Sequence, residues 1–205
     1  MPFNSSFLVS ANKKVGILSN EGKTLVNPEY DSLTYIDSKN NYYLAMKNNL
    51  YGVIDGNGKE IIYIENEQVG IDVSSYERNG IKNGYILLDK LIPVMQNKKW
   101  AFYDIKGNKI CDYKYDGIGC IAGNTSNTYG LLVVPDYDLI VVQKDKKYSV
   151  MTLKGKDDIL PFSFDGMHIK VSSGQVKYYM QFENKEYDMI KTLESMIKKN
   201  NNTNE

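Results

Sequence analysis

Few side chains in this sequence have the chemistry of a catalytic or metal-binding centre. The chain has one histidine, His168, and two cysteines, Cys111 and Cys120. One imidazole and two thiols give no spacing that is typical of a zinc site. His168 stands between apolar neighbours just after a turn, so we interpret it as a structural residue. The sequence also has no nucleophile elbow, phosphate-binding glycine loop or calcium-binding loop.

Acidic residues are numerous enough to supply the two carboxylates of a glycosidase. They recur, however, at equivalent places of a repeated pattern: Asp31, Asp116 and Asp165 form one set, and Asp55 and Asp104 form another. Catalysis needs an asymmetric arrangement at one place, whereas recurrence in every unit indicates a turn-capping role. We therefore expect no catalytic residues, no metal ion and no cofactor. A hydrolase on a β scaffold stays as the weaker alternative.

The 17 tyrosines and the single tryptophan would suit a platform for carbohydrates. Many of these rings fall at strand positions where aromatic residues are favoured for packing. We interpret Trp100, Tyr51 and Tyr148 as core residues for this reason. A cell-surface or glycan-binding module remains an alternative function.

Charge and hydropathy argue against two classes of partner. Lys+Arg and Asp+Glu both number 25, whereas a nucleic-acid binder would carry a basic excess. No apolar run approaches the ~18 residues that span a bilayer. Residues 1–7 lack the basic and then apolar pattern of a secretory signal. We expect a cytoplasmic protein with reduced cysteines that binds neither nucleic acid nor membranes.

One pattern occurs four times along the chain. Each copy has a large apolar anchor, a small residue, two apolar residues and a glycine seven positions after the anchor. An Asn or Asp three positions before each anchor suits a tight hairpin turn. An aromatic–Asp pair follows three of the copies, and we interpret Asn66-Glu67 as its decayed form in the second. The copies are Val15–Gly22, Tyr51–Gly58, Trp100–Gly107 and Tyr148–Gly155.

This pattern predicts an all-β fold of tandem antiparallel three-stranded meanders. The first strand ends at the Asn or Asp turn, the second begins at the anchor, and the third follows the glycine. Both faces of the second strand are apolar, so each unit must pack against its neighbours. The small residue after the anchor predicts the close approach of a ring or a backbone. We expect an open array, with a propeller-like ring as the alternative.

Two of the copies carry the residues of a known family. Tyr51-Gly52-Val53-Ile54-Asp55 with Gly58-Lys59, and Trp100-Ala101-Phe102-Tyr103-Asp104 with Gly107, resemble the WG-repeat (KWG-repeat) family. The other copies match more loosely, since Val15 replaces the aromatic residue and Ser149 replaces the glycine. The resemblance covers roughly residues 7 to 167. It implies a bacterial β-repeat scaffold without known chemistry.

The anchors are unevenly spaced, at 36, 49 and 48 positions from one to the next. The extra residues lie within 70–84 and within 119–130. Insertions in repeat arrays often share a face, which tends to be the binding face. The alternative is that they are extra strands or surface padding. For a binding face, the candidate contacts are Tyr76, Arg78 and Tyr129, of which Arg78 is the only arginine in the sequence.

Residues 184–199 depart from the β pattern. Asn184 can cap a helix, and an apolar stripe at helical spacing follows. We predict an amphipathic α-helix that packs on the array, with residues 200–205 as a disordered tail. The stripe consists of Tyr187, Ile190, Leu193 and Ile197. The expected β-repeat domain spans 1–183, in units of about 7–42, 43–91, 92–139 and 140–183.

These features favour a non-catalytic protein-interaction module that is monomeric. A more specialised hypothesis is an immunity protein or antitoxin that occludes a partner toxin, because small non-catalytic chains with irregular loops suit that role. The partner would be another protein, whose identity the sequence does not indicate.

Overall fold

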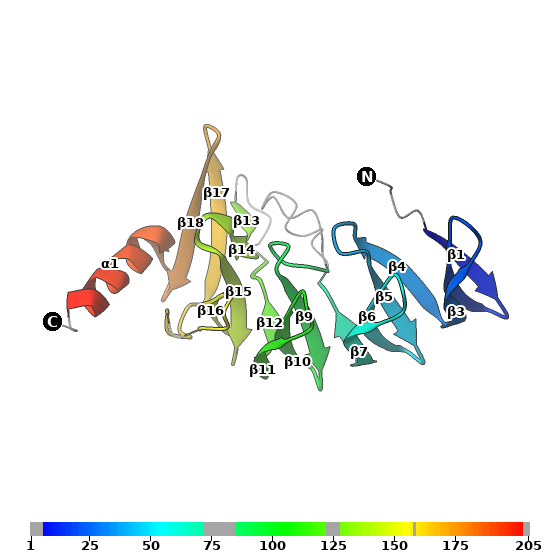
Figure 1. Cartoon of the computed structure of the whole chain (residues 1–205). Coiled ribbons are helices and arrows are strands. Elements are labelled where there is room, and N and C mark those ends of the chain that lie inside the picture. The colour runs from blue at the N-terminus through cyan, green and yellow to red at the C-terminus, as the bar shows by residue number, and fades with distance from the viewer. Residues whose placement is uncertain (1–5, 72–84, 122–127, 158, 203–205) are drawn as a thin grey trace.

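The computed structural model describes residues 6–71, 85–121, 128–157 and 159–202 of the chain. Their strands form five antiparallel sheets that follow one another along an elongated array, and an α-helix stands at its carboxyl-terminal end (Figure 1). Across these ranges no sheet closes into a barrel. The predicted all-β array is confirmed in its open form, and the propeller-like alternative is not seen. No helix in the described ranges is long and apolar enough to cross a membrane.

The first sheet has three strands, and each later sheet has four. The chain turns at each aromatic–acid pair, such as Tyr30-Asp31, which we call a corner. The difference arises because the strand that follows a corner belongs to the next sheet. The first two sheets contain β1 (Ser6–Ala11), β2 (Lys14–Ser19) and β3 (Thr24–Tyr30), then β4 (Ser32–Asp37), β5 (Tyr42–Lys47), β6 (Leu50–Asp55) and β7 (Glu60–Asn66). The third contains β8 (Gln68–Val69), β9 (Leu91–Gln96), β10 (Lys99–Asp104) and β11 (Lys109–Tyr115).

The region predicted as a fourth unit, 140–183, contributes to two sheets rather than one. The strand after the Phe164-Asp165 corner begins a fifth sheet, in the same way that β4 begins the second. The fourth sheet contains β12 (Gly117–Ile118), β14 (Val133–Val134), β15 (Leu139–Lys144) and β16 (Lys147–Thr152), with a 3-10 turn at Pro135–Tyr137. The fifth contains β13 (Thr128–Gly130), β17 (Gly166–Ser172), β18 (Gln175–Phe182) and β19 (Lys185–Asp188).

The turns explain the regularity of the hairpins. Both residues of each predicted two-residue turn have positive φ, as in Asn12 at 51° and Lys13 at 62°. This backbone twist matches the twist of antiparallel strands. The same conformation recurs at Glu183 and Asn184, where the sequence predicted a helix start.

The small residue after each anchor lies where the third strand bulges toward the second. A Cβ on Gly16 would meet the Val26 carbonyl oxygen at 2.4 Å, and one on Gly52 would meet that of Ile62 at 2.5 Å. In the fourth copy the Ser149 hydroxyl donates a hydrogen bond of 2.8 Å to the Leu160 carbonyl. The predicted close approach is therefore made by backbone, and serine fits by bonding to it.

Hydrophobic cores lie between consecutive sheets. Ile17 of the first sheet packs with Tyr43 and Ile54 of the second, and Phe102 of the third packs with Ile140 of the fourth. Trp100 is also buried in this latter core, as predicted. Within the described ranges the sheets thus bury their faces chiefly against their immediate neighbours, which is the physical basis of a repeat array.

The helix begins later than predicted. α1 spans Met189–Asn202, whereas residues 185–188 form β19, which pairs with β18. The expected capping residue, Asn184, lies in a hairpin turn, and Asp188 accepts a hydrogen bond of 3.1 Å from the Lys191 N–H instead. Residues 200–202 continue the helix rather than belonging to a tail.

The apolar face of α1 also differs from the predicted stripe. Met189 and Leu193 are buried in the core of the last two sheets, and Ile190 and Met196 pack beside them. Tyr187 lies on β19 and is exposed, while the side chain of Ile197 lies outside the described part. The helix therefore packs on the terminal sheet, as expected. Its buried face is that of Met189 and Leu193, because the helix begins only at Met189.

Candidate functional site

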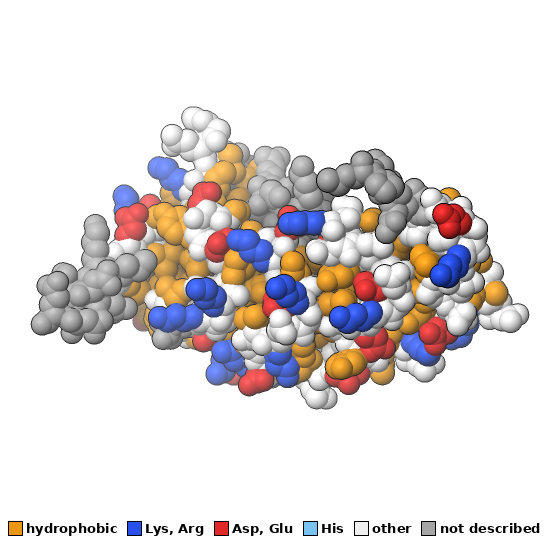
Figure 2. Space-filling model, in the orientation of Figure 1, with side chains coloured by type: hydrophobic (Ala, Val, Ile, Leu, Met, Phe, Trp, Pro, Cys, Tyr) orange, Lys and Arg blue, Asp and Glu red, His pale blue; other side chains and the backbone are white. Residues whose placement is uncertain are grey.

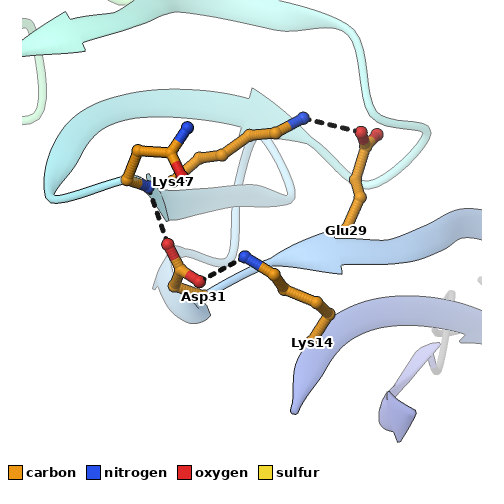
Figure 3. A network of polar contacts seen from close by, with 5 residues as sticks. Lys14, Glu29, Asp31 and Lys47 are labelled. Atoms are coloured by element: carbon orange, nitrogen blue, oxygen red, sulfur yellow. Dashed lines mark hydrogen bonds and ion pairs between the residues drawn. The ribbon is translucent and has the colours of Figure 1, made fainter. Parts of the chain in front are cut away.

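The aromatic–acid corners join consecutive sheets. Asp31 accepts a hydrogen bond from the Lys14 Nζ at 2.5 Å and another from the Asn48 N–H at 2.7 Å. Figure 3 shows this carboxylate between a lysine of the first sheet and the β5–β6 turn of the second, with the Lys47–Glu29 ion pair nearby. One side chain therefore fixes the turn of one unit against the end of the preceding unit.

The same joint recurs further along the array. Asp116 pairs with Lys99 and accepts the Asp145 N–H at 2.7 Å. Asp165 pairs with Lys147 at 2.5 Å and accepts the Glu183 N–H at 3.0 Å. Asp116 and Asp165 therefore have the same two kinds of partner as Asp31. Together with Glu67, which holds the corresponding place between the second and third sheets, we call them the junction carboxylates.

Glu67 corrects the interpretation of Asn66-Glu67 as a decayed pair. Its two carboxylate oxygens accept the N–H groups of Asn97 and Lys98, both at 3.1 Å. The position held by Lys14 in the first unit is Leu50 here, so no lysine competes for these oxygens. The junction is therefore kept with a longer acid that bonds both turn amides.

Hydrogen bonds from lysine lower the pKa of the Asp31, Asp116 and Asp165 carboxyl groups below the ordinary value of 3.8. As the pH falls, the unfolded chain therefore binds these protons before the folded chain does. We expect the stabilisation to be complete well above pH 3.8 and to be lost as the pH falls through 3.8 and then through the lower folded values. Urea unfolding of the wild type and of a variant with all three aspartates changed to asparagine tests this. The wild type should be the more stable at neutral pH, and the difference should shrink in acid; a difference independent of pH would contradict this.

The second recurrent set of acids caps turns, as predicted. Asp55 Oδ1 accepts the N–H groups of Asn57 at 2.8 Å and Lys59 at 3.0 Å. Asp104 Oδ1 accepts those of Lys106 and Asn108, both at 2.8 Å. The first set of carboxylates thus joins consecutive sheets, and the second set caps turns within one sheet.

A cleft of about 480 Å³ opens beside the terminal sheet. One side comes from the second insert, through Cys120, Ile121 and Thr128, and the other comes from β17 and β19, through residues that include Lys170 and Glu186. The insert reaches this place because Thr128–Gly130 pairs with β17 as an additional strand. One side of the cleft is therefore a departure from the repeat, and the other side belongs to the last, incomplete unit.

Three polar side chains make the cleft's charged wall. The His168 Nε2 lies 3.0 Å from one oxygen of Glu186, and the Lys170 Nζ lies 2.6 Å from the other. The His168 ring stacks on Tyr179 with centroids 5.6 Å apart. Burial lowers the pKa of His168 despite the nearby Glu186, and the hydrogen bond from Lys170 lowers the pKa of Glu186. At neutral pH this wall presents a neutral imidazole beside a lysine–carboxylate pair.

The contacts of the cleft wall are ion pairs and hydrogen bonds. Within the described ranges no group of three or more His, Cys, Asp or Glu side chains could hold a metal ion. Cys111 and Cys120 are free, and burial raises the pKa of both thiols. A thiol with a raised pKa is a weak nucleophile, since the thiolate is the reactive form.

The predicted contact residues are placed only in part. Tyr76 and Arg78 lie outside the described residues. Tyr129 lies on β13, half-buried against the core of the last two sheets and next to the cleft residue Thr128. Sequence reasoning missed Lys170 and Glu186. The signal that could have found Glu186 is the turn at Glu183-Asn184. It repeats the two-residue turn of the other units, so the residues after it form a strand, and this strand carries Glu186.

Comparison with known proteins agrees with this architecture. Residues 16–51 match the family model of the WG containing repeat. The match covers one full period, from the residue after the first anchor to the second anchor, and the same meander and junction recur beyond it. No curated protein matches the chain. Residues 16–51 thus form a WG containing repeat, and the structure repeats the same meander and junction along the array.

Proposed function

We propose that the chain is a non-catalytic protein-interaction module of the cytoplasm, and that its partner binds at the carboxyl-terminal cleft. The observation that carries this proposal is the joint construction of the cleft by the second insert and the terminal sheet. The repeated side chains are occupied in stacking the sheets, so a specific contact is best sought where the repeat is broken. The free cysteines suit a reducing compartment.

The composition of the cleft suits a protein partner. Ile121 is 66% exposed at its edge, next to the hydrogen-bonding wall of His168, Lys170 and Glu186. An apolar contact surrounded by polar groups is typical of protein interfaces. Charges elsewhere are mixed, since lysine and acidic side chains are interspersed on the face shown in Figure 2. Such a surface gives nucleic acid no preferred track.

We further propose that the chain inhibits its partner protein, as an immunity protein or antitoxin does. Such a protein acts by occluding its partner, which requires a rigid surface and no chemistry of its own. Co-expression tests this version: the captured partner should arrest growth when expressed alone, and the chain should restore growth. A partner that does not arrest growth when expressed alone would contradict the inhibitor role, but not the proposal of an interaction module.

Capture from the native host tests the cleft directly. Ile121→Asp should reduce recovery of the captured partner about tenfold or more, because it replaces the exposed apolar contact with a charge. Tyr63→Asp is the matched control, since Tyr63 is 71% exposed on β7 of the second sheet. Quantitative mass spectrometry of the captured protein measures both. Equal recovery with both variants, or binding to a glycan array, would contradict the proposal.

The first insert is tested in the same experiment. Tyr76→Ala and Arg78→Ala change the residues that the sequence suggested as contacts. Unchanged capture by both variants, together with loss for Ile121→Asp, would assign binding to the second insert alone.

A further inference from the structure

In each later sheet, the strand that precedes the two-residue turn, such as β5, pairs with the strand that follows the preceding corner, such as β4. No such strand is described beside β1 in the first sheet. The Asp31 N–H donates to the Met46 carbonyl of β5 at 2.8 Å, and the Asp116 N–H donates to the Gln143 carbonyl of β15 at 2.8 Å. Ser10 of β1 holds the same position in the repeat. In the part of the chain that the structure describes, β1 pairs only with β2, so its other edge has no partner strand.

The outer face of the first sheet is also uncovered. Phe7 aligns with Tyr43, Ile92 and Ile140, which are 4%, 0% and 0% exposed because each packs against the preceding sheet. Phe7 itself is 58% exposed, and its neighbour Leu8 is 49% exposed. This end therefore presents a repeat interface on which no described sheet packs.

The free edge of β1 is ready for strand pairing. Ala11 and Lys14 close the two-residue hairpin, and hydrogen bonding alternates along antiparallel strands, so the backbone groups of Ser6, Leu8 and Ser10 point to the free edge. Edge strands are usually protected by charges, proline or a bulge. The segment Ser6-Phe7-Leu8-Val9-Ser10-Ala11 has neither charge nor proline, and its register with β2 is regular.

We propose that two copies of this chain associate through β1, with the two strands antiparallel about a two-fold axis at Leu8. The segment from Ser6 to Ser10 is symmetric in residue type about Leu8: serine, apolar, leucine, apolar, serine. Antiparallel pairing therefore places Leu8 opposite the second copy's Leu8 and each serine opposite a serine. Phe7 lies opposite the second copy's Val9 on the outer face. This self-complementarity is what a two-fold interface requires.

A head-to-tail stack of copies is less compatible with the fold. The face that a preceding unit would offer to Phe7 is covered in the first four sheets by the next sheet, and α1 packs on the fifth. The free edge of β1 is available in both copies at once. The edge thus favours a symmetric dimer over the monomer expected from the sequence.

Cysteine cross-linking tests both association and register. In Leu8→Cys the two thiols belong to a hydrogen-bonded pair with Cα atoms about 5.5 Å apart, which suits a disulfide. In Phe7→Cys and Val9→Cys the same residues of the two copies are offset along the strands, beyond the roughly 7 Å limit for a disulfide. Under mild oxidation we expect a covalent dimer from Leu8→Cys and little from the other two or the wild type. Equal cross-linking at positions 7, 8 and 9 would overturn the register.

Sedimentation of the full chain tests the dimer without cross-linking. The wild type should show a concentration-dependent dimer of the 23.4 kDa chain. Leu8→Lys should weaken it about tenfold or more, because two like charges then lie directly opposite. Val176→Lys on β18 is the control and should leave it unchanged. A wild type that stays monomeric at millimolar concentration overturns the proposal. If removal of residues 2–5, which lie outside the described ranges, then produces a dimer, those residues occupy the edge instead.

Discussion

Gly107→Ala is expected to destabilise the array by about 3 kcal/mol or more. Gly107 has a φ of +86°, and a Cβ there would lie 2.1 Å from the carbonyl oxygen of Ile61 in the preceding sheet. Positive φ alone costs an alanine about 1–2 kcal/mol. The clash is with backbone, so relief requires the second and third sheets to move apart.

Gly22→Ala separates these two causes. Gly22 has nearly the same conformation, with a φ of +81°, but a Cβ there meets nothing within 4 Å. Gly22→Ala should therefore lower the free energy of unfolding only by the cost of the positive φ, about 1–2 kcal/mol. Urea unfolding monitored by circular dichroism measures both variants. Equal losses would mean that the approach of the Gly107 turn to Ile61 does not limit the stacking of the sheets.

The local part of this fold was readable from the sequence because it depends on neighbouring residues. The two-residue turns, the glycine turns and the small residue at Gly16 and Gly52 are set by φ angles and by contacts within one meander. The contact of Gly107 with Ile61 joins two units, so the sequence indicates a glycine there without indicating its second reason.

The ends of the array were harder to predict for the same reason. The fifth sheet has the corner and hairpin turns of a unit, but α1 follows where a glycine turn and a third strand would come. Without the glycine, the pattern stopped at Phe164-Asp165, and the following turn was interpreted as a helix cap. Glu67 was missed because both its length and the Leu50 opposite differ from the other junctions.

The candidate site was predictable only as a region. The second insert was identified as a departure, and the structure does place part of it against the terminal sheet. His168 and Glu186 are 18 residues apart and meet only because β17 and β19 flank β18. Since that pairing depends on the unrecognised turn at Glu183-Asn184, His168 was assigned a structural role without its partner.

Phe102→Ala is expected to cost about 3–5 kcal/mol and to divide the array in two. Phe102 is fully buried in the core between the third and fourth sheets, where its ring meets Tyr115 edge-on with centroids 6.0 Å apart. In a repeat array each sheet is stabilised mainly by its neighbours, so a cavity at a central interface uncouples the two sides. Trp100 belongs to the same core and reports it locally, because it is the only tryptophan.

Two probes distinguish uncoupling from uniform weakening. In Phe102→Ala the fluorescence of Trp100 should change at a lower urea concentration than the circular dichroism of the sheets, whereas in the wild type the two transitions should coincide. Phe7→Ala removes the same side chain at the exposed end and should cost less than about 0.5 kcal/mol at protein concentrations too low for association. Coincident transitions in Phe102→Ala would show that the sheets unfold as one unit, and that stability is shared across the whole array rather than held at each interface.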